Sequence, residues 1–107
     1  CALKRDGTVW CWGWDPPMRN GMTALGYGGV PSEFCVPPGH PEMAVPCRKH
    51  PTQVVGITDA IDMSLGPGNS CAVRRNGSVV CWGNNDGGQL GDWTLTDRAT
   101  PVTVRWR

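Results

Sequence analysis

The sequence predicts an all-β protein made of antiparallel sheets that stack against one another, and three observations support this fold class. The same short motif occurs twice, at residues 1–13 and at residues 71–83. The hairpin that this motif predicts is apolar on both faces, as in a sheet that is covered on both sides. Fifteen glycines and ten prolines interrupt the chain, and no window has the apolar spacing of an amphipathic helix.

The repeated motif reads C-A-L-K-R-D-G-T-V-W-C-W-G in residues 1–13 and C-A-V-R-R-N-G-S-V-V-C-W-G in residues 71–83. In both copies Asp-Gly or Asn-Gly separates two runs of β-prone residues, a pattern that predicts a β-hairpin. We expect a three-residue loop whose last residue, Gly7 or Gly77, has a positive φ.

The hairpin register predicts two disulfides. It places Cys1 opposite Cys11 and Cys71 opposite Cys81, at non-hydrogen-bonded positions whose Cα atoms lie roughly 4.5 Å apart, a separation that a disulfide accepts. The remaining two cysteines then pair most economically with each other: Cys35 and Cys47. Because disulfides persist in oxidising compartments, we expect an extracytoplasmic protein that is secreted, periplasmic or on the cell surface.

The two faces of the second hairpin indicate what surrounds it. Ala72, Val80 and Trp82 point to one face, whereas Val73 and Val79 point to the other. Stacked blades of a β-propeller supply apolar surroundings on both sides of a sheet. A two-sheet sandwich normally leaves one face of each sheet in water and fits this pattern less well.

Six tryptophans would also suit a carbohydrate-binding surface, so their positions matter. Trp10, Trp12 and Trp82 lie in predicted strands at core-facing positions, and we expect them to be buried between blades. The others lie in or beside predicted loops and stay unassigned: Trp14, Trp93 and Trp106.

The first repeat carries an insertion at about residues 14–50. This segment holds seven of the ten prolines, which argues against a central strand or a helix, so we expect a long surface loop pinned by a disulfide. The two copies lie 70 residues apart, and removing about 20 inserted residues leaves a repeat of roughly 50, the size of a propeller blade or solenoid unit.

The rest of the chain predicts further short strands. They are expected at residues 53–55, 60–65, 69–73 and 78–82. An apolar run at residues 101–104 matches residues 51–54 and is expected to open the next blade. We interpret the chain as one partial propeller domain, in which residues 1–51 are the first repeat and residues 52–107 are the second repeat with the start of another blade.

These features resemble the repeats of the regulator of chromosome condensation family, in particular its cysteine-containing bacterial versions. The resemblance covers residues 52–104 and, in the first copy, residues 1–13 with Leu25-Gly26. The matching motifs are Ser70-Cys71-Ala72-Val73, Asn76-Gly77, Cys81-Trp82-Gly83, Asn85, Gly88-Gln89-Leu90-Gly91-Asp92, Thr94 and Pro101-Val102. The family often has His where this chain has Asn69. The resemblance implies a seven-bladed propeller, of which this chain would be a fragment of about two blades.

Several function classes find no support in the residues. No Ser-His or Cys-His arrangement lies outside the disulfides and no phosphate loop is present, so we expect neither an enzyme nor a cofactor. A net charge of +1 from scattered residues is unlike a nucleic-acid footprint. No apolar run approaches the ~20 residues of a membrane span.

One cluster raises a metal site as an alternative. Cys35, His40, Cys47 and His50 place four zinc-ligand types within a short segment. We favour a Cys35–Cys47 disulfide with no metal, because the other four cysteines already indicate an oxidising environment.

The insertion also holds the candidate binding residues, Tyr27, Phe34, Arg48 and Lys49, which include the aromatic and Arg types enriched at interfaces. We therefore expect a non-catalytic repeat module for protein–protein interaction, from a secreted or cell-surface β-propeller. The rest of a propeller or a second copy would complete its ring. A purely structural repeat is the alternative. A weaker one is a guanine-nucleotide exchange factor, since the resemblance implies members that act on a small GTPase as well as secreted propellers that bind and inhibit proteins.

Overall fold

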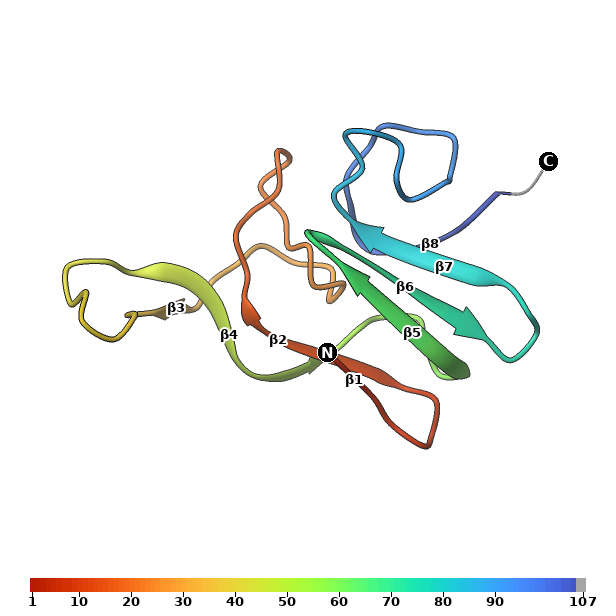
Figure 1. The fold of residues 1–107 in the computed structure, drawn as a ribbon, viewed down its shortest axis with the longest axis horizontal. Coiled ribbons are helices and arrows are strands. Elements are labelled where there is room, and N and C mark those ends of the chain that lie inside the picture. The colour runs from red at the N-terminus through yellow and green to blue at the C-terminus, as the bar shows by residue number, and fades with distance from the viewer. Residues whose placement is uncertain (106–107) are drawn as a thin grey trace.

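A computed structural model describes residues 1–105. The described residues form two four-stranded antiparallel sheets, with strand orders β1-β2-β4-β3 and β5-β6-β7-β8 (Figure 1). The strands are β1 (Ala2–Leu3), β2 (Val9–Trp14), β3 (Phe34–Cys35), β4 (Val45–Gln53), β5 (Ala60–Gly66), β6 (Asn69–Arg74), β7 (Val79–Gly83) and β8 (Arg98–Thr103). The all-β prediction is confirmed. The unassigned Trp106 lies outside the described residues. Within residues 1–105 no helix is long and apolar enough to cross a membrane.

Both predicted hairpins are present with the predicted loop. In the second hairpin, β6–β7, the Arg74 N–H donates to the Ser78 carbonyl at 2.8 Å. In the first, β1–β2, the Lys4 N–H donates to the Thr8 carbonyl at 2.9 Å. The glycine of each loop has a positive φ, 89° in the first and 88° in the second. The two copies of the motif therefore fold in the same way.

The cysteines pair as the sequence predicts. The disulfides are Cys1–Cys11, Cys35–Cys47 and Cys71–Cys81. In the two hairpin disulfides the Cα atoms lie 4.0 and 4.1 Å apart, close to the separation of a non-hydrogen-bonded strand pair. Over the part of the chain that the structure describes, no cysteine is free.

The insertion contains a central strand, contrary to the expectation of a loop across residues 14–50. β4 is nine residues long and lies between β2 and β3. Its prolines are tolerated because of their positions. Pro51 lies where the β2–β4 register shifts, so it need not donate a ladder hydrogen bond. Pro46 serves as an acceptor, and its carbonyl receives the Asp15 N–H at 3.0 Å.

The strand Arg98–Thr103 completes the second sheet, which corrects the expectation that residues 101–104 open another blade. β8 pairs with β7, placing Val102 opposite Cys81. β4 pairs with β2 in the same manner through Thr52. Of the separate strand expected at residues 53–55, only Gln53 lies in a strand, as the last residue of β4. An apolar run in the sequence does not show which neighbour it pairs with, so this boundary needed the structure.

Each hairpin has two distinct faces. We call the face that carries the cysteines the disulfide face and the opposite one the tryptophan face. The disulfide face holds Cys1, Leu3, Val9 and Cys11 in the first sheet and Cys71, Val73, Val79 and Cys81 in the second. The tryptophan face holds Ala2, Trp10 and Trp12 in the first sheet and Ala72, Val80 and Trp82 in the second.

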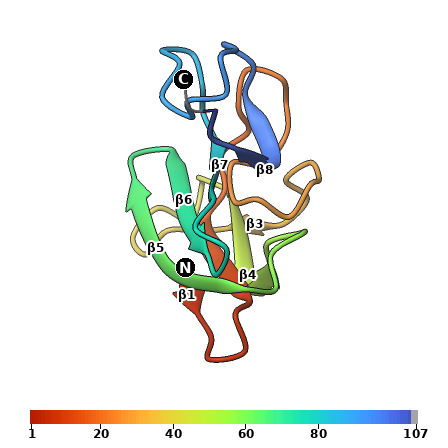
Figure 2. The same cartoon turned by 90° about the vertical axis from the view of Figure 1, so that its right-hand side faces the viewer.

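The core lies between the two sheets. Val9 and Cys11, from the disulfide face of the first sheet, share one buried cluster with Ala72, Val80 and Trp82, from the tryptophan face of the second. β1 and β5 lie side by side in both views (Figures 1 and 2). The sheets thus stack with unlike faces in contact.

The predicted burial of the tryptophans is only partly right. Trp82 is fully buried, at 0% exposure, and Trp10 is half-buried, but Trp12 is 44% exposed. The expectation for Trp12 is wrong because this side chain lies on the tryptophan face of the first sheet. The second sheet covers the other face.

Candidate interaction site

Part of the insertion projects from the first sheet as an arm, which we define as residues 33–49 (Figure 1). It is a ribbon made of β3 and the first half of β4, in which Cys35 pairs with Val45. The Cys35–Cys47 disulfide joins the two strands. The sequence predicted a disulfide-pinned excursion here, and the structure adds that its two sides are paired strands.

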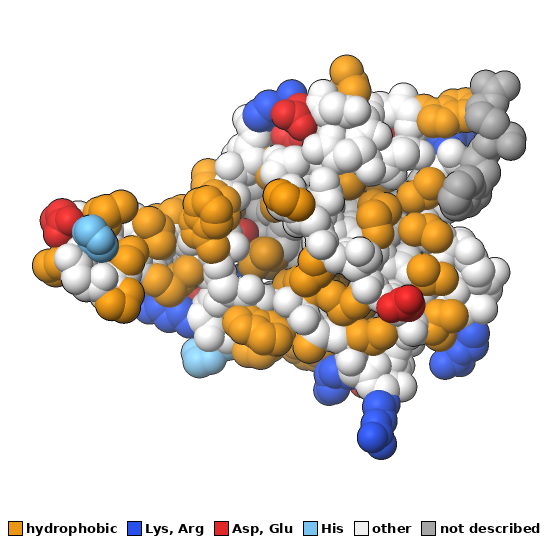
Figure 3. Space-filling view, in the orientation of Figure 1, with side chains coloured by type: hydrophobic (Ala, Val, Ile, Leu, Met, Phe, Trp, Pro, Cys, Tyr) orange, Lys and Arg blue, Asp and Glu red, His pale blue; other side chains and the backbone are white. Residues whose placement is uncertain are grey.

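Apolar side chains lie exposed along the arm (Figure 3). Phe34, Val36 and Met43 are 54%, 56% and 47% exposed. The arm tip, residues 36–44, has backbone hydrogen bonds of its own, donated by His40 and Met43. The tip is therefore a compact turn with an apolar surface.

The base of the arm is fastened to the loop that follows β2. The Arg48 guanidinium lies over the Tyr27 ring, 4.1 Å from its centre, and Arg48 Nη1 donates to Glu33 Oε1 at 3.1 Å. The Tyr27 hydroxyl donates to the Asp15 carboxylate, which is buried and also accepts the Thr23 hydroxyl at 2.6 Å. Burial, and then the hydrogen bond to Asp15, raise the pKa of Tyr27. These contacts hold the arm in one orientation.

The structure places the four candidate binding residues in two environments. Tyr27 and Arg48 contact each other in the base, where they support the arm. Phe34 and Lys49 are exposed on the arm itself. A role of these residues in binding stays a prediction.

The metal alternative loses two of its four ligands to a disulfide. Cys35 and Cys47 are bonded to each other. His40 lies in the arm tip, with its Nδ1 3.5 Å from Glu42 Oε1, and His50 is exposed on β4. Among residues 1–105 no three His, Cys, Asp or Glu side chains gather in a metal-binding group.

An ion pair that the sequence analysis missed joins the insertion to the second sheet. Arg19 Nη2 lies 2.9 Å from Asp97 Oδ1, and its Nε donates to Oδ2 at 3.1 Å, a bidentate contact. Asp97 is buried and also accepts the Asn85 N–H at 2.8 Å. Arg19 is the main cause that lowers the pKa of Asp97, although burial opposes it. The partners lie in two loops far apart in sequence, so no local pattern signals the pair.

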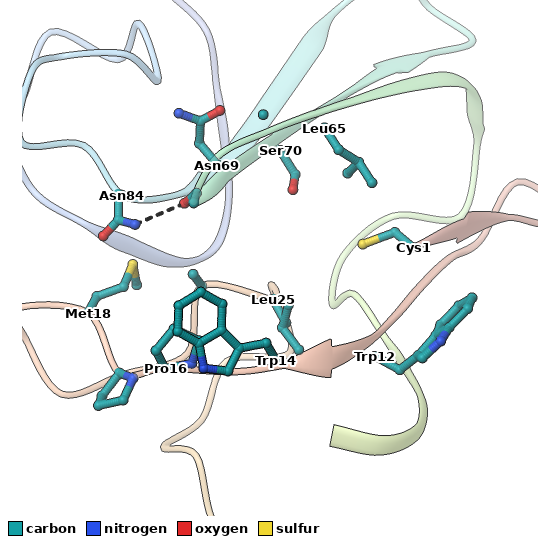
Figure 4. A pocket seen from close by; sticks show the side chains of 14 residues that line it. Cys1, Trp12, Trp14, Pro16, Met18, Leu25, Leu65, Asn69, Ser70 and Asn84 are labelled. Carbon is teal, nitrogen blue, oxygen red and sulfur yellow. Dashed lines mark hydrogen bonds between the residues drawn. The ribbon is translucent and has the colours of Figure 1, made fainter. Parts of the chain in front are cut away.

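A pocket of about 290 Å³ lies between the end of β2, the loop that follows it and the β5–β6 turn (Figure 4). Trp14 forms one side and is 71% exposed. Asn69 and Asn84 lie across from it, and Asn84 Nδ2 donates to the Gly68 carbonyl at 3.2 Å. The side chains that line the pocket carry no charge, so its surface suits a neutral group better than an ion.

The duplicated hairpins, the Cys-Trp-Gly turns and the four-stranded sheets agree with a known repeat. Residues 60–89 match the sequence pattern of the "Regulator of chromosome condensation (RCC1) repeat". This chain carries an RCC1 repeat. The matched residues run from the start of β5 to the loop after β7. They therefore contain the second hairpin of this chain, β6–β7, and its disulfide.

Curated relatives extend the similarity to the first copy. The human and mouse "E3 ubiquitin-protein ligase HERC2" are each 30% identical over 106 residues, which are 97% of this chain and 2% of the relative. The human "Probable E3 ubiquitin-protein ligase HERC3" is 31% identical over 104 residues, 97% of this chain and 8% of the relative. The chain thus spans only 2% to 8% of the length of these relatives. No solved structure is significantly similar to it.

Proposed function

We propose that this chain is a non-catalytic, propeller-type module that binds another protein, and that the arm is its contact surface. The observation that carries the proposal is the arm itself. It exposes Phe34, Val36 and Met43 while disulfide, stacking and ion-pair contacts fix its base. Interfaces favour such aromatic and Met side chains on a pre-organised support, since less ordering entropy is then lost on binding.

We further propose that the module works outside the cytoplasm, as part of a secreted or cell-surface propeller of the bacterial type. The support is chemical. Three disulfides connect all six cysteines, and such bonds form and persist in oxidising compartments.

The test removes the tip of the arm and keeps its base. Because Cys35 pairs with Val45, replacing residues 36–44 by Asn-Gly closes the ribbon with a two-residue turn. A companion point variant is Phe34→Ser, and its matched control is Ile61→Ser, since Phe34 and Ile61 are 54% and 57% exposed on different sheets.

The readout is binding to a protein that is first identified by cross-linking to the intact chain and then purified. We expect the tip replacement and Phe34→Ser to weaken binding at least about tenfold, as for a central interface residue, with Ile61→Ser unchanged. Equal binding by all variants would refute the arm as the contact surface. If the intact chain captures no partner, the purely structural repeat is the better interpretation.

A further inference from the structure

The arm has a free strand edge. The first sheet has the order β1-β2-β4-β3, so β3 pairs with β4 on one side only (Figure 1). An edge strand presents backbone N–H and C=O groups that lack a partner, and another strand can pair with them. The backbone groups of β3 that point outward therefore determine what this edge can bind.

The register of the arm fixes the direction of these groups. The Cys47 N–H donates to the Glu33 carbonyl at 3.0 Å, so the backbone groups of Glu33 face β4. The next residue, Phe34, lies opposite Pro46, which has no N–H to donate. Because successive residues of an antiparallel strand turn their backbone groups to opposite sides, the N–H and C=O of Phe34 point away from β4.

The extended backbone continues on both sides of Phe34. From residue 30 to residue 38 the even-numbered residues are exposed and the odd-numbered residues are half-buried, an alternation with the period of a β-strand. Ser32 and Val36 thus have the same orientation as Phe34. Among residues 1–105, no backbone–backbone hydrogen bond outside the strand ladders engages any of these three residues.

The neighbouring prolines leave this edge open. A proline interferes with an added strand only where its missing N–H would have pointed to that strand. Pro31 and Pro37 are at odd-numbered positions, so the N–H that each lacks belongs to the inward set. The side chains beside the edge are apolar, since Val30, Phe34 and Val36 are 64%, 54% and 56% exposed. The edge therefore combines free hydrogen-bonding groups with a row of apolar side chains.

We propose that the protein partner adds an extended segment of its own chain to the free edge of β3. This inference rests on the proposed function, because it states how the partner binds to the arm. In β-strand addition, main-chain hydrogen bonds supply affinity and side chains at alternate positions supply specificity. The residue of the added strand that pairs with Phe34 lies on the same face as the Phe34 ring, where an apolar side chain packs well. The segment therefore carries apolar residues at every second position and no proline where an N–H must donate.

The test presents the purified partner as overlapping synthetic peptides that cover its sequence. We expect one of them to bind the intact chain, because an added strand needs no folded partner. Hydrogen exchange measured by NMR, with and without that peptide, then reports on the edge. The Phe34 amide should exchange at least about tenfold more slowly in the complex. The Cys35 amide should be unchanged, since Cys35 already pairs with Val45.

Two variants separate the backbone of Phe34 from its ring. Phe34→Ala and Phe34→Pro both remove the aromatic side chain, but only the second removes the outward N–H. The ladder with β4 should persist in both, because an edge position with an outward N–H tolerates proline. Mass spectrometry and circular dichroism check the disulfides and the strands. We expect Phe34→Pro to bind the peptide about tenfold more weakly than Phe34→Ala.

The outcomes distinguish this inference from the proposed function. If the folded partner binds through the arm but no peptide does, or if the Phe34 amide exchanges equally fast with and without peptide, the arm is the contact surface and strand addition is wrong. Equal binding by Phe34→Ala and Phe34→Pro leads to the same conclusion. If slow exchange of the Phe34 amide appears without peptide and strengthens with protein concentration, a second copy occupies the edge, which also overturns the proposal. An intact chain that captures no partner overturns both proposals.

Discussion

Trp12 and Trp82 are the central residues of the same Cys-Trp-Gly motif in two hairpins of nearly identical sequence, yet one side chain is 44% exposed and the other is fully buried. The local backbone is the same in both copies, as the matching loop hydrogen bonds show. The difference comes from the neighbour, because the first sheet covers the tryptophan face of the second. In a stacked repeat protein, burial is therefore a property of the position of a unit within the stack.

The sharpest test of this comparison removes each tryptophan. Trp82→Ala takes a fully buried aromatic side chain from the core and should lower the free energy of unfolding by about 3–5 kcal/mol. Trp12→Ala removes a partly exposed side chain and should cost less than about 1.5 kcal/mol. Urea unfolding of the two variants measures both values. Similar losses would contradict the burial of only one of them.

The hairpin disulfides should show no such difference between the copies. Both close loops with a sequence separation of 10 residues, and a disulfide stabilises mainly by restricting the unfolded chain. Replacing Cys1 and Cys11 by Ala, or Cys71 and Cys81 by Ala, should lower the free energy of unfolding by about 3 kcal/mol in each case. The same urea experiment provides the measurement. Losses that differ by more than about twofold would show that the neighbour also matters here.

Four glycines predict a crossed pattern of effects. A Cβ at Gly83 would lie 2.4 Å from the Gly68 carbonyl oxygen, whereas one at Gly13 meets nothing within 4 Å. In the hairpin loops the order is reversed, since a Cβ at Gly7 would lie 2.5 Å from the Thr58 carbonyl oxygen and one at the equivalent loop glycine of the second hairpin meets nothing.

All four glycines have positive φ, so Ala carries a conformational cost at every one. The backbone clash should add about 1–3 kcal/mol in Gly83→Ala and Gly7→Ala but not in Gly13→Ala or Gly77→Ala. Thermal unfolding of the four variants measures the pattern. Gly7 and Gly13 belong to the first hairpin, and Gly77 and Gly83 to the second. Equal losses of stability within either pair would show that backbone movement relieves the clash.

The smallest predicted effect is on the loss of stability at low pH. Burial opposes ionisation of Asp92, but hydrogen bonds from Thr94, Asn85 and Arg98 outweigh it and lower the pKa from 3.8 to about 2. A carboxylate whose pKa is depressed by folding stabilises the protein above its unfolded pKa. This stabilisation is lost as the pH falls from 3.8 through about 2.

Asp92→Asn should therefore unfold more easily at neutral pH and lose less stability than the unchanged chain between pH 4 and pH 2. Urea unfolding at several pH values measures the two profiles. Only the second copy has this carboxylate: when Leu25-Gly26 is aligned with Leu90-Gly91, the first copy has Tyr27 at the position of Asp92. Parallel profiles would show that Asp92 does not contribute to the acid response.

Local chemistry determined how well the structure could be predicted from sequence. The hairpin register and its disulfides follow from an Asn-Gly or Asp-Gly loop between β-prone runs, and these predictions are confirmed. The central position of β4, the sheet to which β8 belongs and the exposure of Trp12 depend on partners distant in sequence. A proline-rich composition disfavours a strand only where the N–H must donate, and Pro46 and Pro51 occupy positions that tolerate its loss.

The candidate site follows the same rule. The sequence identified the insertion and its cysteine pair, because composition alone sets that segment apart. It did not separate Tyr27 and Arg48, which support the arm, from the exposed Phe34. Nor did it identify the Arg19–Asp97 pair, because nothing near either residue marks its partner.

The arm also makes this chain suitable as a carrier for foreign peptides. Its base is secured by the Cys35–Cys47 disulfide and by Arg48, whereas the backbone hydrogen bonds of His40 and Met43 stay within the tip. A sequence grafted in place of residues 36–44 would begin and end at paired strand positions that are already fixed. Libraries of such grafts would vary the recognition properties of the protein while leaving its stacked sheets undisturbed.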